Sequence, residues 1–201
     1  MTPAFEFGPV TEADFDALVA LRTRVMRASM ERLGRFDPAT AALRFRSSFR
    51  SAGTRRILVG GEAAGCVGYW PEPDGDGDGD GDGDGDGDGD GDGDGNGDGD
   101  AMRIEHFYFT EKFQQLGLGG AVLRRLFDAA PSQAARFRVG ALRDSDANRF
   151  YLRHGFVKVS EGEWDIAYER PRLPLLVPLL APVPAPVPAP VLTGGCLCGA
   201  V

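Results

Sequence analysis

The chain has 201 residues, three cysteines and a formal net charge of −8 at pH 7. This length suits one or two domains. An odd number of cysteines argues against a disulfide framework, and the N-terminus lacks the basic and then apolar pattern of a signal peptide. We therefore expect a cytoplasmic protein.

The first 50 residues predict one strand and two helices. Residues 4–7 form the strand, and apolar residues then recur at helical spacing after Thr11, whose pairing with Asp14 resembles a helix cap. A second helix is expected to start at Asp37-Pro38, with Asp as the N-cap and Pro at the first helical position.

A β-hairpin and a low-complexity insertion follow. Residues 56–59 and 63–70 predict the hairpin. Residues 74–100 alternate Asp and Gly, with Asn96 as the single substitution, and hold 13 of the 30 acidic residues. Removing these charges changes the formal charge from −8 to +5, so the acidity says little about partners. With no apolar side chain, the tract is expected to be disordered, and calcium association through charge alone is an alternative.

The stretch from residue 102 to residue 130 carries the first functional signal. Residues 102–109 predict a strand and residues 117–130 a helix, joined through Gln114-Gln115-Leu116-Gly117-Leu118-Gly119-Gly120. Glycines at a helix N-terminus leave backbone N–H groups free at the positive end of the helix dipole, which suits phosphate. Val122 excludes a dinucleotide-binding G-x-G-x-x-G, and Gly119-Gly120-Ala121 excludes a P-loop. The remaining pattern is Gln-x-x-Gly-x-Gly.

A second motif lies about 30 residues downstream. After a strand at 136–142, the sequence supplies Asn148, Phe150-Tyr151 and Gly155-Phe156 on and just after a short helix at 146–154. Two strands are expected to follow, at 156–160 and 164–168. Together with the glycine loop, this motif resembles the Gcn5-related N-acetyltransferase (GNAT) superfamily over residues 4–170.

The resemblance implies a fold and a domain organisation. The expected fold class is α/β (α+β), a GNAT fold with a mixed, twisted sheet of about seven strands flanked by four helices. In that family the fourth and fifth strands splay apart, and the opening holds the pantetheine arm of acetyl-CoA. The expected GNAT domain is 1–170, with the Asp–Gly insertion (72–100) in the hairpin between the third and fourth strands. Residues 171–192 are expected to be a Pro-rich linker, because their prolines rule out a membrane helix.

The resemblance also implies a reaction. An acetyl group would pass from acetyl-CoA, a cosubstrate, to a primary amine of a small molecule or peptide by direct attack. Tyr151 would be the acid for the leaving thiolate, and Asn148, one helical turn earlier, would contact the pantetheine arm. Backbone N–H groups near Phe107 to Phe109 would stabilise the oxyanion. The expected cofactor-binding residues are Phe107, Phe109, Gln114, Gln115, Leu116, Gly117, Leu118, Gly119, Gly120, Asn148 and Tyr151.

The catalytic base has two candidates on the fourth strand. Glu105 and His106 are neighbours, and adjacent strand residues face opposite ways, so at most one of them is expected to face the cleft. Several family members use a carboxylate on this strand, whereas a histidine has an ordinary pKa closer to neutrality. Glu105 is favoured as the base, although either residue could be purely structural.

The acceptor pocket of the family is shaped by the first two helices and their connection. The expected substrate-binding residues are Arg27, Glu31, Arg35 and Phe36, together with His106. The charged members could equally form a solvated helix surface. Residues 31–37 and 163–170 resemble a recurring bacterial GNAT subgroup without a settled substrate. We expect no nucleic-acid or membrane partner, and a homodimer stays open.

Two further interpretations stay open. A GNAT-fold module could bind acyl-CoA without turnover, as a sensor or regulatory domain. Residues 194–201 resemble the opening of the glutathione-dependent formaldehyde-activating enzyme family, in which paired cysteines bind zinc. The further thiols of a tetrahedral site are missing, so no metal is assigned. Residues 193–201 are either the start of a truncated zinc-binding domain, as in a zinc-dependent lyase fusion, or a chance likeness.

Overall fold

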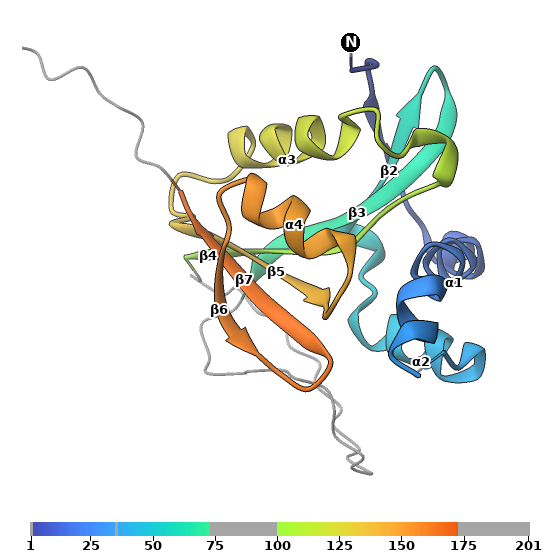
Figure 1. Ribbon diagram of the computed structural model, residues 1–201. Coiled ribbons are helices and arrows are strands. Elements are labelled where there is room, and N and C mark those ends of the chain that lie inside the picture. The colour runs from blue at the N-terminus through green and yellow to red at the C-terminus, as the bar shows by residue number, and fades with distance from the viewer. Residues whose placement is uncertain (1, 35, 73–99, 173–201) are drawn as a thin grey trace, which may run out of the picture.

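A computed structural model of the chain describes residues 2–34, 36–72 and 100–172. In this part of the chain, seven strands form one mixed sheet that four α-helices flank (Figure 1). The expected α/β (α+β) fold class is confirmed. The Asp–Gly tract before Asp100, the Pro-rich segment after Arg172 and residues 193–201 lie outside the described residues. The disorder, linker and zinc expectations for them, like the domain division, stay predictions.

The elements follow the order that the sequence predicts. The first half contains β1 (Glu6–Pro9), α1 (Phe15–Arg32), α2 (Pro38–Ser48), β2 (Thr54–Val59) and β3 (Glu62–Glu72). The second half contains β4 (Ala101–Phe109), α3 (Leu118–Asp128), β5 (Arg136–Leu142), α4 (Asp146–Arg153), β6 (Val157–Glu161) and β7 (Asp165–Pro171). Glu72 pairs with Ala101, so the insertion joins two strands that are neighbours in the sheet.

The two central strands separate halfway along the sheet. The strand order is β1-β2-β3-β4-β5-β7-β6, and β4 with β5 is the parallel pair between two antiparallel blocks. That pairing runs from Ala101–Arg136 to Ile104–Val139 and then stops. The last five residues of β4 therefore have no partner on their β5 side, and the expected splay of the fourth and fifth strands is present.

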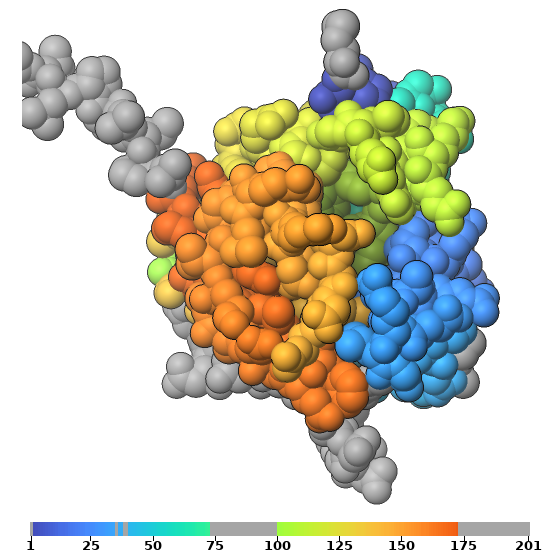
Figure 2. All heavy atoms as spheres, in the orientation of Figure 1, coloured from blue at the N-terminus to red at the C-terminus, as the bar shows by residue number. Residues whose placement is uncertain are grey.

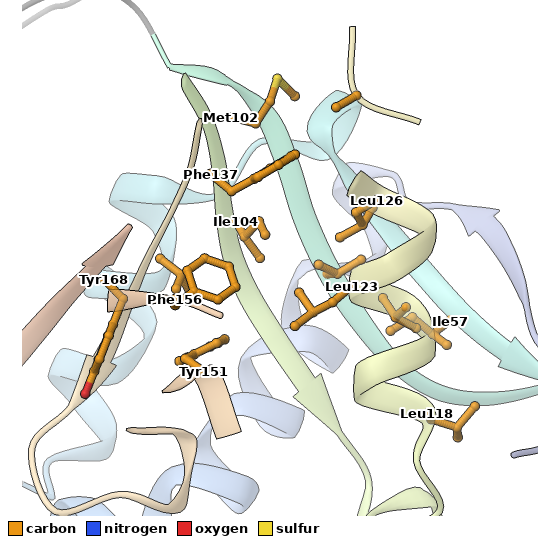
Figure 3. Packing of buried hydrophobic residues seen from close by; sticks show 14 of the residues in the cluster. Ile57, Met102, Ile104, Leu118, Leu123, Leu126, Phe137, Tyr151, Phe156 and Tyr168 are labelled. Atoms are coloured by element: carbon orange, nitrogen blue, oxygen red, sulfur yellow. The ribbon is translucent and has the colours of Figure 1, made fainter. Parts of the chain in front are cut away.

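Two hydrophobic clusters hold the helices on the sheet. Leu118, Val122, Leu123 and Leu126 recur along one side of α3 and are almost completely buried. Figure 3 shows Leu123 and Leu126 beside Ile104 and Phe137 of the central strands. Each fully buried leucine contributes about 1.5–3 kcal/mol. Phe45 and Phe49 pack with Leu18 and Leu21 of α1 in the second cluster.

A β-bulge interrupts the pairing of β3 with β4. Cys66 pairs with Tyr108 and Gly68 with Glu105, so two residues of β4 stand opposite one residue of β3. His106 lies in this bulge, and its backbone has a positive φ of 49°. The Cys66 thiol donates to the His106 carbonyl oxygen at 3.1 Å, which holds the bulge from the partner strand.

Gly65 of β3 lies beside the bulge, and its lack of a side chain lets the backbones of β3 and β4 approach closely. A Cβ added there would lie 2.1 Å from the carbonyl oxygen of Tyr108. Because that obstacle is backbone, we expect Gly65→Ala to lower the free energy of unfolding in urea by at least about 1–3 kcal/mol. Gly140→Ala is the matched control, since an added Cβ there meets nothing within 4 Å. Equal stability of the two variants would contradict this prediction.

Candidate active site

The site is the opening that begins where β4 and β5 separate. The first turn of α3 and the α4 helix border it on one side, and α1 with α2 borders it on the other (Figure 1). Figure 2 shows a recess in the surface where these segments meet, between the orange α4 region and the blue helices. The predicted phosphate loop, acid and base all come from the elements around this opening.

The loop before α3 has the shape of an anion site. Gln115 and Gly117 both have positive φ, 60° and 77°, and Gly117 is the N-cap of α3. The first backbone bond of the helix runs from the Ala121 N–H to the Gly117 carbonyl oxygen. The N–H groups of the three residues in between, 118–120, precede that bond and have no hydrogen-bond partner within the described chain. Free donors at a helix N-terminus bind anions.

Gln114 has a structural part in this loop. Its side-chain Nε2 donates to the carbonyl oxygen of Phe109 at 2.9 Å, which ties the loop to the end of β4. Leu118 is also structural in its side chain, which is 1% exposed in the core. Gln114 is nevertheless exposed, as are Gln115, Leu116 and Gly117, which follow it in the loop.

Two glycines allow α4 to pack on the first turn of α3. A Cβ on Gly119 would lie 3.0 Å from the Phe150 ring, and one on Gly120 would lie 2.6 Å from Nε2 of His154. The His154 ring is itself fixed, because its Nδ1 is 2.8 Å from the Phe150 carbonyl oxygen. The glycines therefore serve the packing of two helices as well as access to the backbone N–H groups.

Tyr151 places a protonated hydroxyl beside the opening. Its side chain is 5% exposed and packs against Phe150, Phe156 and Tyr168. Burial, with a smaller contribution from the nearby Tyr108, raises the pKa of the Tyr151 hydroxyl well above its ordinary value. Within the described chain the one buried side-chain polar atom without a partner belongs to Glu105. No hydrogen bond of the Tyr151 hydroxyl is present within that part of the chain.

Asn148 closes the turn between β5 and α4. Its Nδ2 donates to the carbonyl oxygens of Leu142 at 2.8 Å and Ser145 at 2.9 Å, and its Oδ1 accepts from the Tyr168 hydroxyl at 2.9 Å. Both amide hydrogens are thus committed to the fold. The contact of Asn148 with a pantetheine arm stays a prediction. The one atom of the Asn148 amide with remaining hydrogen-bonding capacity is Oδ1, whose second lone pair could accept from a ligand.

The expectation that Glu105 and His106 face opposite ways is wrong. Glu105 Oε2 lies 3.8 Å from His106 Nε2, so both side chains are on the face of the sheet toward α2. The reason is the bulge at His106, which interrupts the alternation of side chains along β4. Arg103 donates to Oε1 of Glu105 at 2.9 Å, and Oε2 is buried without a hydrogen-bond partner in the described part of the chain.

His106 is a neutral, buried neighbour of this carboxylate. Its side chain packs on Phe45, with ring centroids 4.3 Å apart, and its Nε2 is 3.2 Å from the Ser48 hydroxyl. Burial lowers the pKa of His106, and the charge of Glu105 partly opposes that effect. The neutral imidazole can therefore hydrogen-bond the Ser48 hydroxyl and pack on Phe45 without adding positive charge to the site.

The structure places the predicted acceptor-binding residues in different environments. Arg27 and Glu31 pair with each other at 2.7 Å on the exposed surface, and the Arg27 guanidinium lies over the Phe36 ring. Phe36 lines a hollow of about 290 Å³ between α1 and α2, while Arg35 lies outside the described residues. Sequence reasoning missed Arg22 and Arg44 on the walls of this hollow. Arg22 could have been suspected from the sequence, because it is a charged residue directly beside the apolar positions of α1.

Comparison of the sequence with known protein families shows which family the chain belongs to. Residues 23–156 match the Acetyltransferase (GNAT) family. The chain belongs to the GNAT family. No curated protein matches it in sequence.

Solved structures with the GNAT fold resemble this chain at low sequence identity. An acetyltransferase from Thermus thermophilus is 17% identical with a TM-score of 0.56, covering 85% of this chain and 98% of that one. Ard1 from Thermoplasma volcanium is 15% identical with a TM-score of 0.52, covering 85% and 99%. N-acetylglutamate synthase from Neisseria gonorrhoeae, complexed with coenzyme A and N-acetyl-glutamate, is 11% identical with a TM-score of 0.53, covering 86% and 36%.

Proteins with the GNAT fold bind acetyl-CoA, and the described residues fit that ligand. The three unbonded N–H groups at the start of α3 suit its pyrophosphate, and the unpaired edge of β4 suits its amide-containing arm. GNAT membership also indicates an acyltransferase. None of the described helices is long and apolar enough to span a bilayer.

The buried His106 makes the stability of this GNAT domain depend on pH. Because its pKa is lowered, the unfolded chain takes up the proton first as the pH falls. We expect the free energy of unfolding to decrease as the pH falls below about 6.5, the ordinary histidine pKa. His106→Gln should flatten the plot of Tm against pH between about pH 6.5 and 5, before most carboxylates protonate.

His154→Gln, which changes the other histidine of the chain, is the control for this experiment. If His106→Gln kept the full slope, the buried imidazole would not be its source.

Proposed function

We propose that the protein is an acetyl-CoA-dependent N-acetyltransferase that acetylates a primary amine of a small molecule or peptide by direct attack. One observation carries the proposal: Glu105, whose buried Oε2 has no hydrogen-bond partner in the described chain, is the first residue of β4 beyond its pairing with β5, and Tyr151 lies on α4, the helix that follows β5. Tyr108 lies within electrostatic range of both side chains. Aminolysis of a thioester needs one proton acceptor and one proton donor.

The backbone supplies binding and polarisation in this proposal. The N–H groups of residues 118–120 hold the pyrophosphate, as at other helix N-termini. The free edge of β4 beyond Ile104 pairs with the extended arm in the manner of an added strand. A backbone N–H near Phe107 to Phe109 then polarises the thioester carbonyl and stabilises the oxyanion.

Glu105 and Tyr151 handle the protons. Oε2 of Glu105 accepts a proton from the acceptor ammonium, which leaves a neutral amine to attack the carbonyl carbon. The C–N bond forms and the C–S bond breaks, with the electron pair passing to sulfur. Tyr151 donates a hydrogen bond to the departing thiolate. Since its pKa lies above the value of about 8.5 for a thiol, Tyr151 stabilises the thiolate by this hydrogen bond. The attacking nitrogen loses its second proton as the tetrahedral intermediate collapses to the amide, and this proton neutralises the thiolate to give CoA. Glu105 releases the first proton to solvent, which restores the carboxylate.

The remaining elements of the proposal concern partners and location. The acceptor is a small-molecule or peptide amine, with no nucleic-acid or membrane partner, and we place the reaction in the cytoplasm. The cosubstrate is acetyl-CoA, and no resident metal takes part in the steps above.

Removal of the Tyr151 hydroxyl is the central test. We expect Tyr151→Phe to lower kcat for CoA release from acetyl-CoA by about 10²-fold across responsive amines, with an unchanged Kd for CoA. Tyr69→Phe is the matched control, because its hydroxyl bonds the Leu126 carbonyl of α3 instead of reaching the opening. Tight CoA binding without turnover of any amine would replace the enzyme by an acyl-CoA sensor. Absence of CoA binding would overturn the proposal itself.

Substitution of Glu105 tests the base. Glu105→Gln keeps the size of the side chain and its oxygen toward Arg103, and should lower kcat/KM at neutral pH by about 10²-fold. The loss should shrink toward about pH 10, where solution supplies the neutral amine. Glu72→Gln is the matched control, since Glu72 also accepts from Arg103 but belongs to the far end of β3. Equal losses in both variants would assign the effect to Arg103 and not to a base.

A further inference from the structure

The hollow between α1 and α2 is not used by the steps above. Its volume of about 290 Å³ lies at the lower limit of small-molecule pockets, which span about 300–1,000 Å³. Met26, Met30 and Phe36 give it an apolar wall. Arg22 and Arg44 also line it, one from each helix. The hollow therefore combines an apolar surface with two guanidinium groups.

These two arginines differ from their neighbours in having no carboxylate partner in the described chain. Nearby, Arg27 pairs with Glu31, Arg46 with Glu12, and Arg56 with Asp14. Arg22 instead has neutral partners: its Nη1 lies 3.4 Å from the Ala41 carbonyl oxygen, and its guanidinium lies near the protonated Tyr108 hydroxyl.

A partly buried cation is normally paired with an anion, so one with neutral partners beside a hollow favours an anionic ligand. Asp37, on the same wall, accepts a hydrogen bond from Thr40. Among the described lining residues, two arginines and one carboxylate carry a formal charge.

Arg22 also connects the hollow to the reacting groups. Burial lowers the pKa of His106, and the Arg22 charge adds to that effect. Burial raises the pKa of Tyr108 to about 12, and the Arg22 charge opposes that effect. The geometry of α2 makes the same connection, because Arg44 lines the hollow and the next residue, Phe45, packs on the His106 ring, whose Nε2 lies 3.8 Å from Oε2 of Glu105. An acceptor whose ammonium group meets Oε2 of Glu105 and whose body extends past α2 would therefore place a negative group in the hollow beside Arg22.

We propose that Arg22, with Arg44, binds the carboxylate of the acceptor, and that the acceptor is an amino acid with an apolar side chain. This inference rests on the proposed acetyl transfer and names its substrate class. A guanidinium matches a carboxylate by two parallel hydrogen bonds. Two guanidinium groups beside an apolar wall suit a carboxylate that is attached to an apolar body. The apolar wall of the hollow receives the apolar side chain.

Matched acceptors test the proposal. L-leucine, L-leucinamide and 3-methylbutylamine share one apolar body and differ in the carboxylate. We expect kcat/KM for L-leucine to exceed the other two by at least about 10-fold, since hydrogen bonds to charged groups are stronger than those between neutral groups. Arg22→Gln should lower the L-leucine value by about 10–10²-fold, so that the preference over L-leucinamide collapses. Arg44→Gln should do so less, because Arg44 is exposed.

Arg24→Gln is the matched control, because Arg24 is an arginine of α1 outside the hollow and its loss should leave all three values unchanged. Circular dichroism and Tm establish that each variant is folded. Equal use of L-leucine and L-leucinamide by the wild type would overturn the proposal, as would better use of O-phosphoethanolamine than of L-leucine.

Calorimetric titration of L-leucine into the CoA-saturated protein separates the two proposals. Binding that Arg22→Gln abolishes, without turnover of any amine, would support the carboxylate site and contradict the proposed enzyme. Turnover of amines without a carboxylate preference would support the enzyme and contradict the site. Absence of both binding and turnover of L-leucine would overturn the carboxylate site.

Discussion

The end of the β4–β5 pairing at Ile104 and Val139 is the constraint on which the rest of the structure depends. A strand that loses its neighbour leaves N–H and C=O groups without partners, which is costly unless water or a ligand satisfies them. Around this gap the chain collects the start of α3, the Tyr151 face of α4 and the bulge of β4. The hydrophobic cluster under α3 includes Met102 and Ile104 of β4 with Phe137 and Val139 of β5, so the paired halves of these strands are anchored in the core.

Backbone strain is concentrated at the same place. His106, Gln115 and Asp144 are the non-glycine residues with positive φ in the described chain, and each belongs to a segment that borders the opening. Such conformations cost about 1–3 kcal/mol each and persist only where neighbours hold them. The thiol of Cys66 bonds the His106 carbonyl, Arg32 bonds the Asp144 carbonyl, and the Gln114 side chain ties the loop to β4. Long-range contacts thus maintain the shape of the site.

Local pattern was enough to predict the elements and the loop, whereas the fate of individual side chains was not. Apolar periodicity and glycine positions are local signals, so the strands, the four helices and the α3 N-terminus follow from them. The bulge depends on how β3 and β4 align, and one extra residue reversed the expected separation of Glu105 and His106. The committed amide hydrogens of Asn148 and the position of Arg22 likewise depend on segments far away in sequence. The sequence pattern predicts which residue types lie near the site, whereas tertiary packing determines which of these side chains keep a polar atom available for a ligand.

The orientation of Glu105 illustrates how far such packing extends. Arg103 bridges Glu105 to Glu72 at the end of β3, and Arg138 of β5 bridges Glu72 to Glu169 of β7. These pairs are partly buried, and a ladder of them across four strands fixes its members together. Since Arg103 uses Oε1, the ladder turns Oε2 toward His106 and leaves it without a hydrogen-bond partner among the described residues. The end of β3, where the Asp–Gly insertion begins, is held by the same ladder. The ion pairs that orient the carboxylate therefore join residues of the sheet strands themselves.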